Sequence, residues 1–416
     1  MMTSRERVLA ALRHEETDRP PIDFGGMRST GIMALAYNRL KAHLGRAEET
    51  RVYDVVQQLA QPSEAVLDLF HVDVVDLGRA FLTRPGDWHD WTLPDGSTAK
   101  APAYFRPASD GHGGWQVAAE DGTVFGRMPA GANHLSQCHW PLRDLATPDE
   151  IGDLGERAKK VTWMALPSPP RHLDLMTDEG LEELREGARR LYETTDRAIM
   201  AAFGGNFLEG GQFLCGMARF LEMLAGEPKL AEALMDQLLE LYLTVLPRFL
   251  EAVGPYVQLI QVGDDLGTQA APQISPDMYR RLLKPRHRAL YSYIREHFDG
   301  FIFLHSCGSI RPLLPDLIDV GVQVINPVQT SAAGMDPAEL KREFGRDLTF
   351  WGGGCETQTT LRLGAPEQVA AQVRERLRLF SPGGGYVFNQ VHNILSDVPP
   401  ENVVAMFRAA AAEPQP

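Results

Sequence analysis

Short apolar runs alternate with amphipathic segments along most of the chain. The apolar runs lie near positions 22, 74, 198, 257, 301, 322, 348 and 385. Segments between them, such as 365–381, carry apolar residues at helical spacing, and Ser275 followed by Pro276 is typical of a helix start. Strands that alternate with helices in this way predict βαβ units and a parallel sheet. Eight such units predict an α/β fold of the TIM (β/α)8 barrel type.

The pattern changes between residues 84 and 160. The turn pairs Asp95-Gly96 and Asp121-Gly122 stand between short alternating runs, as they do in β-hairpins. Four of the six tryptophans also fall in this region, which favours a packed aromatic core. We therefore expect an N-terminal helix and the first barrel units at 1–83, an inserted β-rich flap at 84–160, and the remainder of the barrel at 161–416.

Composition limits the partners that the protein can have. The formal net charge is −14, which argues against nucleic acid or an anionic membrane as a partner, because both require a basic surface. No apolar run approaches the roughly 20 residues of a membrane helix, and the polar start is not typical of a signal peptide. The four cysteines are too few for a disulfide framework. We expect a cytoplasmic protein that acts on a small-molecule substrate.

The run GFIFLHSCGSI at 300–310 ends in His305 and Cys307. Side chains two apart on a strand point the same way, so both are expected to face the barrel mouth, where TIM barrels carry their chemistry. Cys355 ends the strand two further along and is expected to approach the same point. Three such ligands with one open position make a catalytic zinc site. The alternative is that both thiols are simply buried and the imidazole only forms hydrogen bonds.

Other strand ends are polar as well. Asp264 and Asp265 end one strand, where one carboxylate can face the cavity while its neighbour caps the next element. Asp265 is a candidate fourth ligand or general acid or base, and Glu209 is another candidate for proton transfer. His392 follows the last strand, where it can contact substrate or join the metal. The candidate catalytic residues are therefore Asp264, Asp265, Glu209 and His392.

Several strings taken together resemble the uroporphyrinogen decarboxylase superfamily. They are GDDLGTQ, SPDMYRRLLKP, HSCGSI, INPVQ, FWGGG and PGGGYVF, with the opening RERVLAALRHEETDRPP and the closing VPPENVVAMF. The resemblance implies a TIM barrel, in agreement with the strand count, and a homodimer. The superfamily includes uroporphyrinogen decarboxylases and zinc methyltransferases that work with corrinoid proteins or methylcobalamin.

The residues that separate these two branches favour the methyltransferases. The decarboxylases have an early MRQAGRY segment whose arginines bind porphyrinogen carboxylates, whereas GGMRSTGIM keeps only Arg28. The methyltransferases have a His-x-Cys motif at a strand end, which His305 and Cys307 match. Their remaining Cys lies on the last strand, where this chain has His392, and Cys355 falls one strand earlier. The resemblance therefore implies the same metal with a shifted ligand.

We predict a zinc-dependent methyltransferase that moves a methyl group between a small methylated substrate and a corrinoid. The chain has no Asp-x-His-x-x-Gly motif for binding a corrinoid, so the corrinoid is expected on a partner protein or as free methylcobalamin. Arg28, which would bind a substrate anion, and the strand-end residues Asp76 and Gln329 are the candidates for substrate binding. The prediction requires the two thiols and the imidazole to meet at one point.

Two other functions stay open. One is a metal-free decarboxylase that acts on a porphyrinogen or a smaller carboxylic acid, with Asp76 or Asp265 as the acid. The other is a binding protein that keeps the barrel without turnover.

Overall fold

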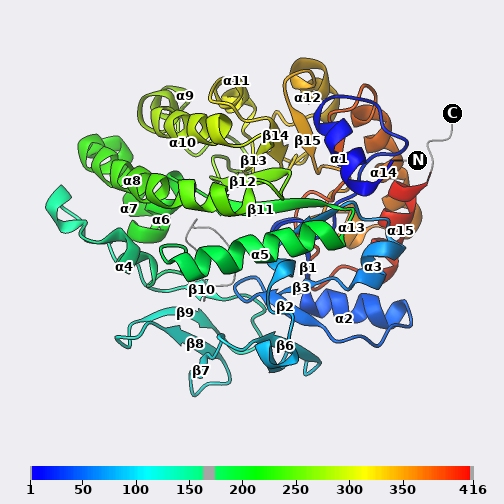
Figure 1. Ribbon diagram of the computed structural model, residues 1–416, viewed down its shortest axis with the longest axis horizontal. Helices are drawn as coiled ribbons and strands as arrows, with labels where there is room; N and C mark the ends of the chain where they lie inside the picture. The colour runs from blue at the N-terminus through cyan, green and yellow to red at the C-terminus, as the bar shows by residue number, and fades with distance from the viewer. Residues whose placement is uncertain (1, 163–173, 413–416) are drawn as a thin grey trace.

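A parallel sheet that curves into a barrel forms the centre of the protein. The computed structural model describes residues 2–162 and 174–412. The 7-stranded sheet has the order β16-β15-β14-β13-β12-β11-β4, and each strand is parallel to its neighbours (Figure 1). These strands are β4 (Val74–Asp76), β11 (Ala198–Gly204), β12 (Leu259–Gly263), β13 (Phe301–His305), β14 (Val324–Asn326), β15 (Thr349–Trp351) and β16 (Tyr386–Val387).

The eighth position of the barrel is taken by a short extended segment around Ile22. Ile22 forms a single parallel bridge with Phe388, and the Asp23 N–H donates to the Phe388 carbonyl at 2.9 Å. On the other side, the Asp73 N–H donates to the Ile22 carbonyl at 2.7 Å, just before β4. Pro21 has no N–H to extend this ladder, which keeps the segment short. The segment lies between β16 and β4 and closes the ring, so the predicted TIM-type barrel is confirmed.

Helices surround the barrel and alternate with its strands. They are α1 (Ser4–Leu12), α2 (Ala34–His43), α3 (Glu64–Leu69), α4 (Leu154–Ala158), α5 (Asp178–Thr194), α6 (Leu208–Cys215), α7 (Met217–Gly226), α8 (Pro228–Val253), α9 (Pro276–Met278), α10 (Lys284–His297), α11 (Leu314–Asp319), α12 (Pro337–Phe344), α13 (Thr360–Leu363), α14 (Pro366–Phe380) and α15 (Pro400–Ala411). Within the described ranges, no helix is long and apolar enough to span a bilayer.

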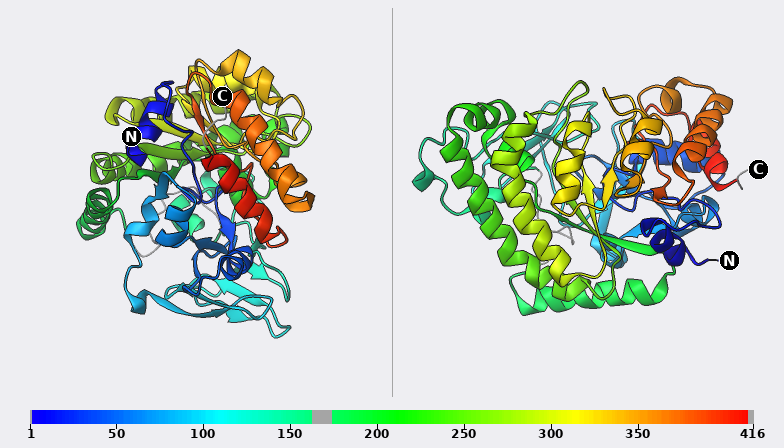
Figure 2. Two further views of the ribbon diagram at one scale, coloured as in Figure 1. Left: turned by 90° about the vertical axis from the view of Figure 1, so that its right-hand side faces the viewer. Right: turned by 90° about the horizontal axis from the view of Figure 1, so that it is seen from above.

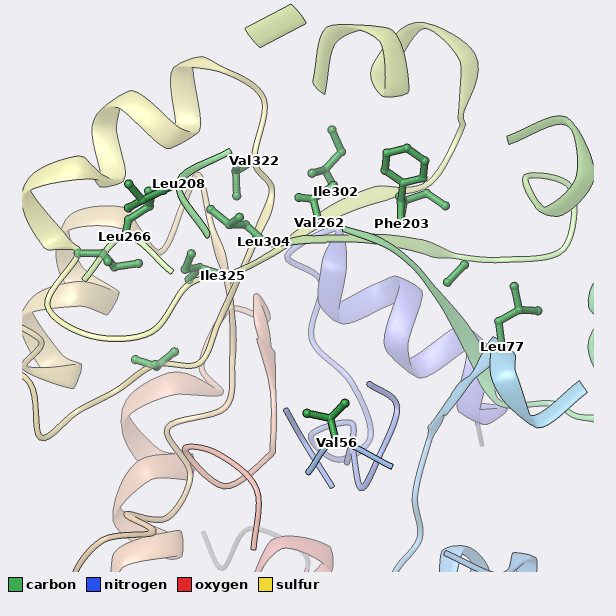
Figure 3. Packing of buried hydrophobic residues seen from close by; sticks show 14 of the residues in the cluster. Val56, Leu77, Phe203, Leu208, Val262, Leu266, Ile302, Leu304, Val322 and Ile325 are labelled. Carbon is green, nitrogen blue, oxygen red and sulfur yellow. The ribbon is translucent and has the colours of Figure 1, made fainter. Parts of the chain in front are cut away.

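The alternation of side chains along β13 shows how the barrel positions its chemistry. Ile302 and Leu304 belong to the core between sheet and helices, where Figure 3 shows them beside Val262. Phe303 belongs instead to the core inside the barrel. Because successive strand residues point to opposite faces, His305 shares the inward direction of Phe303. The strand therefore delivers an imidazole directly above the packed interior of the barrel.

The β-rich part forms two further sheets on one side of the barrel, drawn in blue and cyan in Figures 1 and 2. The first has the order β1-β3-β2-β6-β5 and the second the order β10-β9-β8-β7. The strands are β1 (Ile32–Met33), β2 (Arg51–Asp54), β3 (Leu59–Gln61), β5 (Trp88–Thr92), β6 (Thr98–Pro102), β7 (Ala108–Ser109), β8 (Trp115–Ala118), β9 (Val124–Met128) and β10 (Ser136–Gln137).

The first of these sheets joins the expected flap to earlier residues. Arg51 of β2 pairs with Lys100 of β6, so strands on both sides of position 84 share one sheet. Trp91 packs against Trp115 with ring centroids 5.3 Å apart, and against Phe105 at 5.5 Å. The boundaries at 84 and 160 stay predictions.

Candidate active site and metal centre

A cavity of about 280 Å³ lies at the carboxyl ends of the barrel strands. On the barrel side it is lined by Gly204, Glu209, Gly263, Asp265, His305 and His392. On the opposite side it is lined by Val56, Gln57, His134, Leu135 and Gln137 of the β-rich part. The cavity is therefore formed jointly by the strand ends and by the inserted sheets.

Three side chains at the barrel end of this cavity could hold a metal ion. One ligand atom each from His305, Cys307 and His392 lie within 4.8 Å of one another. The His305 Nε2 atom lies 3.5 Å from the Cys307 Sγ atom and 3.7 Å from the Asp265 Oδ1 atom. A tetrahedral zinc ion with a Zn–S bond of about 2.3 Å and a Zn–N bond of about 2.05 Å separates these two ligand atoms by about 3.6 Å. The spacing and the donor types therefore fit zinc, with Asp265 as a candidate fourth ligand.

A hydrogen bond from a neighbouring strand fixes the ring of His305. The His305 Nδ1 atom lies 2.7 Å from the Asn326 Oδ1 atom, while the Asn326 Nδ2 atom donates to the Trp351 carbonyl at 3.0 Å. Because the amide nitrogen is engaged with a carbonyl, its oxygen faces the imidazole, and Nδ1 must carry the proton. The lone pair of His305 is then on Nε2, which faces the thiol. This is the arrangement expected of a metal-ligating histidine and its supporting partner.

His392 is also suited to donate a lone pair. Burial and the neighbouring His305 lower the pKa of His392 to about 4. The centroids of the two imidazole rings are 5.8 Å apart. At neutral pH the His392 ring is therefore uncharged, which is the state that binds a metal.

The same end of the cavity brings several acidic groups close together. The Asp265 Oδ1 atom accepts the Cys307 N–H at 2.8 Å, and the Glu209 Oε2 atom accepts the Asp265 N–H at 3.0 Å. Burial and the charge of Asp265 raise the pKa of Glu209 well above its usual value. Burial and the charges of both carboxylates raise the pKa of the Cys307 thiol in the same way. A divalent cation would relieve this repulsion, so the electrostatics also fit a metal.

Asp264 points away from the cavity and supports its wall. Its carboxylate accepts the N–H groups of Phe207, Leu208 and Glu209 at 2.8 to 3.0 Å, at the start of α6. The Nε2 atom of His287 lies 3.2 Å from the same carboxylate. A carboxylate satisfies the unpaired N–H groups of a helix N-terminus. The structure thus places Asp264 where it holds the helix that carries Glu209, and only Asp265 of the pair lines the cavity.

Cys355 does not join the metal group, in contrast to the sequence-based expectation. It is completely buried and packs in the core between sheet and helices. Burial raises the pKa of its thiol to about 12, and Arg376 of α14 is among the charges that influence it. The chain turns after β15 at Gly352 and Gly353, both with positive φ, which carries Cys355 out of the layer of the strand ends. Among the described residues, the third ligand position is instead offered by His392.

The three predicted substrate-binding residues occupy different places. Arg28 lines the cavity. Asp76 is partly buried beside it, where its Oδ1 atom accepts the Gly78 N–H at 2.6 Å and burial raises its pKa to about 6. Gln329 lies outside the cavity lining and accepts the Gly308 N–H at 2.8 Å, so it fixes the loop that follows Cys307.

Sequence reasoning missed several residues of the site. Asn326 stands at the end of β14 in INPVQ, so its position as a polar strand end was visible in the sequence. His134 and Gln137 come from the β-rich part, where no periodicity indicates which residues reach the cavity.

Comparison with known proteins places the chain in a family. A family model described as Uroporphyrinogen decarboxylase (URO-D) matches residues 165–412. The chain belongs to this family. A uroporphyrinogen decarboxylase of Anaeromyxobacter dehalogenans is 24% identical over 420 residues, which cover 98% of each chain.

Shorter matches lie in other members of the URO-D family. A uroporphyrinogen decarboxylase of Pelodictyon phaeoclathratiforme is 24% identical over 188 residues, which cover 44% of this chain. One of Chlorobaculum tepidum is 22% identical over 195 residues, or 46% of this chain. The matches span about half the length of these two relatives, 49% and 52%.

A solved structure has the same fold as this URO-D family chain. It is a methyltransferase from Methanosarcina mazei, with a TM-score of 0.56 and 18% sequence identity over 99% of this chain and 98% of that one. At this identity the similarity shows the shared barrel.

Proposed function

We propose that this URO-D family protein is a zinc-dependent methyltransferase that moves a methyl group between a small substrate and a corrinoid carrier. The observation that carries the proposal is the group formed by His305, Cys307 and His392 at the barrel end of the cavity, which His305 and His392 line. The similar fold of a protein named methyltransferase supports it. The proposed ligands are the Cys307 thiolate and the imidazoles of His305 and His392, with Asp265 as a candidate fourth ligand. Cys355 is not one of them. Homodimerisation and a cytoplasmic location stay predictions.

Several residues in and around the cavity would have separate roles in such a transfer. Zinc, when bound, would hold a thiol or another Lewis base of the substrate in its reactive form. Asn326 orients His305 toward the thiol, and residues of the β-rich part line the opposite side of the cavity. As the bond between the methyl carbon and its heteroatom breaks, the electron pair stays on the heteroatom, and the methyl group passes to the corrinoid carrier, which would supply the electron pair of the new bond. The raised pKa of Glu209 favours its protonated form, and Glu209 lines the cavity where it can give a proton to the leaving heteroatom.

Decarboxylation is the second candidate, because the curated relatives are named uroporphyrinogen decarboxylases. Asp76, with its pKa raised to about 6, is suited to act as an acid near neutral pH. Two features oppose a porphyrinogen as the substrate. The cavity of about 280 Å³ is below the usual range of roughly 300–1,000 Å³ for pockets that hold drug-sized ligands. Among the lining residues that the structure describes, Arg28 is the only arginine, and its Nε atom lies 3.3 Å from the Asp54 Oδ2 atom.

Metal content and methyl transfer test the proposal together. Purified wild-type protein is expected to hold one zinc per chain and to demethylate added methylcobalamin when supplied with a suitable thiol acceptor. Cys307→Ser is expected to lose the metal, whereas the matched control Cys355→Ala keeps it, because the Cys355 thiol lies in the core. Metal-free wild-type protein that consumes a carboxylic acid would instead establish decarboxylation. Protein with neither metal nor turnover would point to a binding protein.

A further inference from the structure

One wall of the cavity, formed by the end of β12 and the segment that begins α6, carries oxygen atoms without hydrogen-bond partners. Gln261 and Gly263 line the cavity from β12, whereas Val262 between them packs in the core between sheet and helices. Successive strand residues point to opposite faces, so Gln261 and Gly263 share the inward direction. Asn206 and Glu209 line the cavity beside them, and a Cβ added at Gly263 would lie 3.0 Å from the Asn206 Nδ2 atom. We call Gln261, Asn206 and Glu209 the acceptor wall.

The amide nitrogens of this wall are already engaged. The Gln261 Nε2 atom donates to the Val262 carbonyl at 2.8 Å, and the Asn206 Nδ2 atom donates to the Glu209 Oε2 atom at 2.5 Å. Because carbonyl and carboxylate oxygens accept hydrogen bonds, each amide turns its nitrogen toward them. The Asn206 Oδ1 atom is then buried without a partner, and the Gln261 Oε1 atom accepts no hydrogen bond from the described residues. A ligand that supplies donors would satisfy these oxygens.

Glu209 adds a third acceptor and a charge to the wall. Its Oε2 atom accepts both the Asn206 amide and the Asp265 N–H, which leaves the Oε1 atom without a partner in the described part of the chain. Among the described residues, no lysine or arginine forms an ion pair with Glu209 or Asp265. Burial and the neighbouring carboxylates raise the pKa of Glu209. A cation beside Glu209 would therefore relieve an unfavourable concentration of acidic groups.

We propose that the acceptor wall binds the ammonium group of a small primary amine. An ammonium group has three N–H donors and no acceptor, and the wall offers three oxygens without partners, one of them on a carboxyl group. The inference rests on the proposed function in taking the cavity as the substrate site, and it names the substrate class. Where the methyl group leaves this nitrogen, the electron pair stays on the nitrogen and takes the Glu209 proton. The product is an ammonium ion beside the carboxylate that remains.

Four small ligands with the same propyl or propionyl chain length test this inference. Propylammonium has the charge and three N–H donors, 1-propanol has one donor and no charge, trimethylpropylammonium has the charge and no donor, and propionate has the opposite charge. Each is titrated at neutral pH, by calorimetry or ligand-observed NMR, into full-length protein that has been dialysed against a chelator. Wild-type protein is expected to bind propylammonium at least about tenfold more tightly than each of the others, because hydrogen bonds between charged groups are the stronger ones.

Two variants of the wall are compared with matched controls. Glu209→Gln is expected to weaken propylammonium binding at least about tenfold and to change 1-propanol binding by less than about twofold. Gln261→Leu removes an uncharged acceptor and is expected to weaken propylammonium binding by about 3- to 10-fold. Glu227→Gln and Gln212→Leu make the same changes outside the cavity lining, and both are expected to bind propylammonium like wild type.

Three results would overturn the inference. They are wild-type protein that binds propylammonium no more tightly than 1-propanol, folded Glu209→Gln that keeps the wild-type affinity, and a loss in Cys307→Ser as large as that in Glu209→Gln, which would place the cation among the metal ligands. If Glu209→Gln does not fold, wild-type protein alone decides, because equal binding of trimethylpropylammonium would exclude recognition of the N–H groups. Since the titrations use metal-free protein, purified protein without zinc would refute the methyltransferase proposal and leave the expected amine selectivity unchanged.

Discussion

Replacing Asn326 by alanine tests whether the ring of His305 is held for a metal. Asn326 is completely buried, and its amide contacts the His305 Nδ1 atom at 2.7 Å and the Trp351 carbonyl at 3.0 Å. Partners of this kind typically contribute 10- to 100-fold to metal affinity. Asn326→Ala is therefore expected to weaken zinc binding by about 1.4–2.7 kcal/mol. Competition with a chromophoric chelator measures the change.

A buried amide that is not part of the cavity lining provides the matched control. Asn402 is 1% exposed, and its Nδ2 atom donates to the carbonyls of Leu361 and Gly364. Asn402→Ala is expected to lower stability through these lost hydrogen bonds, by about 1–3 kcal/mol, while zinc affinity stays unchanged. If zinc affinity is unchanged in Asn326→Ala, or falls equally in both variants, then Asn326 does not orient the imidazole for a metal.

Three further predictions concern stability, measured by urea unfolding. Asp264→Ala is expected to lower the free energy of unfolding by about 3–5 kcal/mol, because α6 loses the carboxylate that accepts its first N–H groups. A loss below about 1 kcal/mol would contradict this role. Burial raises the pKa of Asp23 from 3.8 to about 6, so its contribution to stability falls by roughly 2.4 kcal/mol as pH rises from 4 to 7. Asp23→Asn should remove this decrease, and an identical pH profile in the variant would argue against it. Gly211→Ala is expected to lower the free energy of unfolding by about 1–3 kcal/mol, because the added Cβ would meet the Phe220 ring at 2.3 Å. The control Gly226→Ala, which has open space around the added Cβ, should change stability by less than about 1 kcal/mol.

The barrel could be predicted from the sequence because its signals are local. Apolar runs between amphipathic segments located the strands, and the alternation along β13 placed His305 and Cys307 at the mouth. The run near position 22 was among the eight predicted strands, and the structure reduces it to a single bridge between Ile22 and Phe388. The pairing of Arg51 with Lys100 likewise joins distant residues and has no periodic signal.

The ligand set was harder to predict because one turn decides it. The position of Cys355 after β15 suggested a ligand, yet the glycine turn at Gly352 and Gly353 directs the thiol into the core. His392 was recognised as a residue that can join the metal, and the structure brings it to His305 and Cys307. Strand parity predicts the direction of a side chain within a strand, but not beyond the turn that ends it.

X-ray absorption at the zinc edge tests the metal centre most directly. For the protein loaded with one zinc per chain, we expect one sulfur neighbour at about 2.3 Å and nitrogen or oxygen neighbours at about 2.0–2.2 Å. The sulfur signal should vanish in Cys307→Ser and persist in Cys355→Ala. Two sulfur neighbours in the wild-type protein, or a sulfur signal lost in Cys355→Ala, would contradict the site formed by His305, Cys307 and His392.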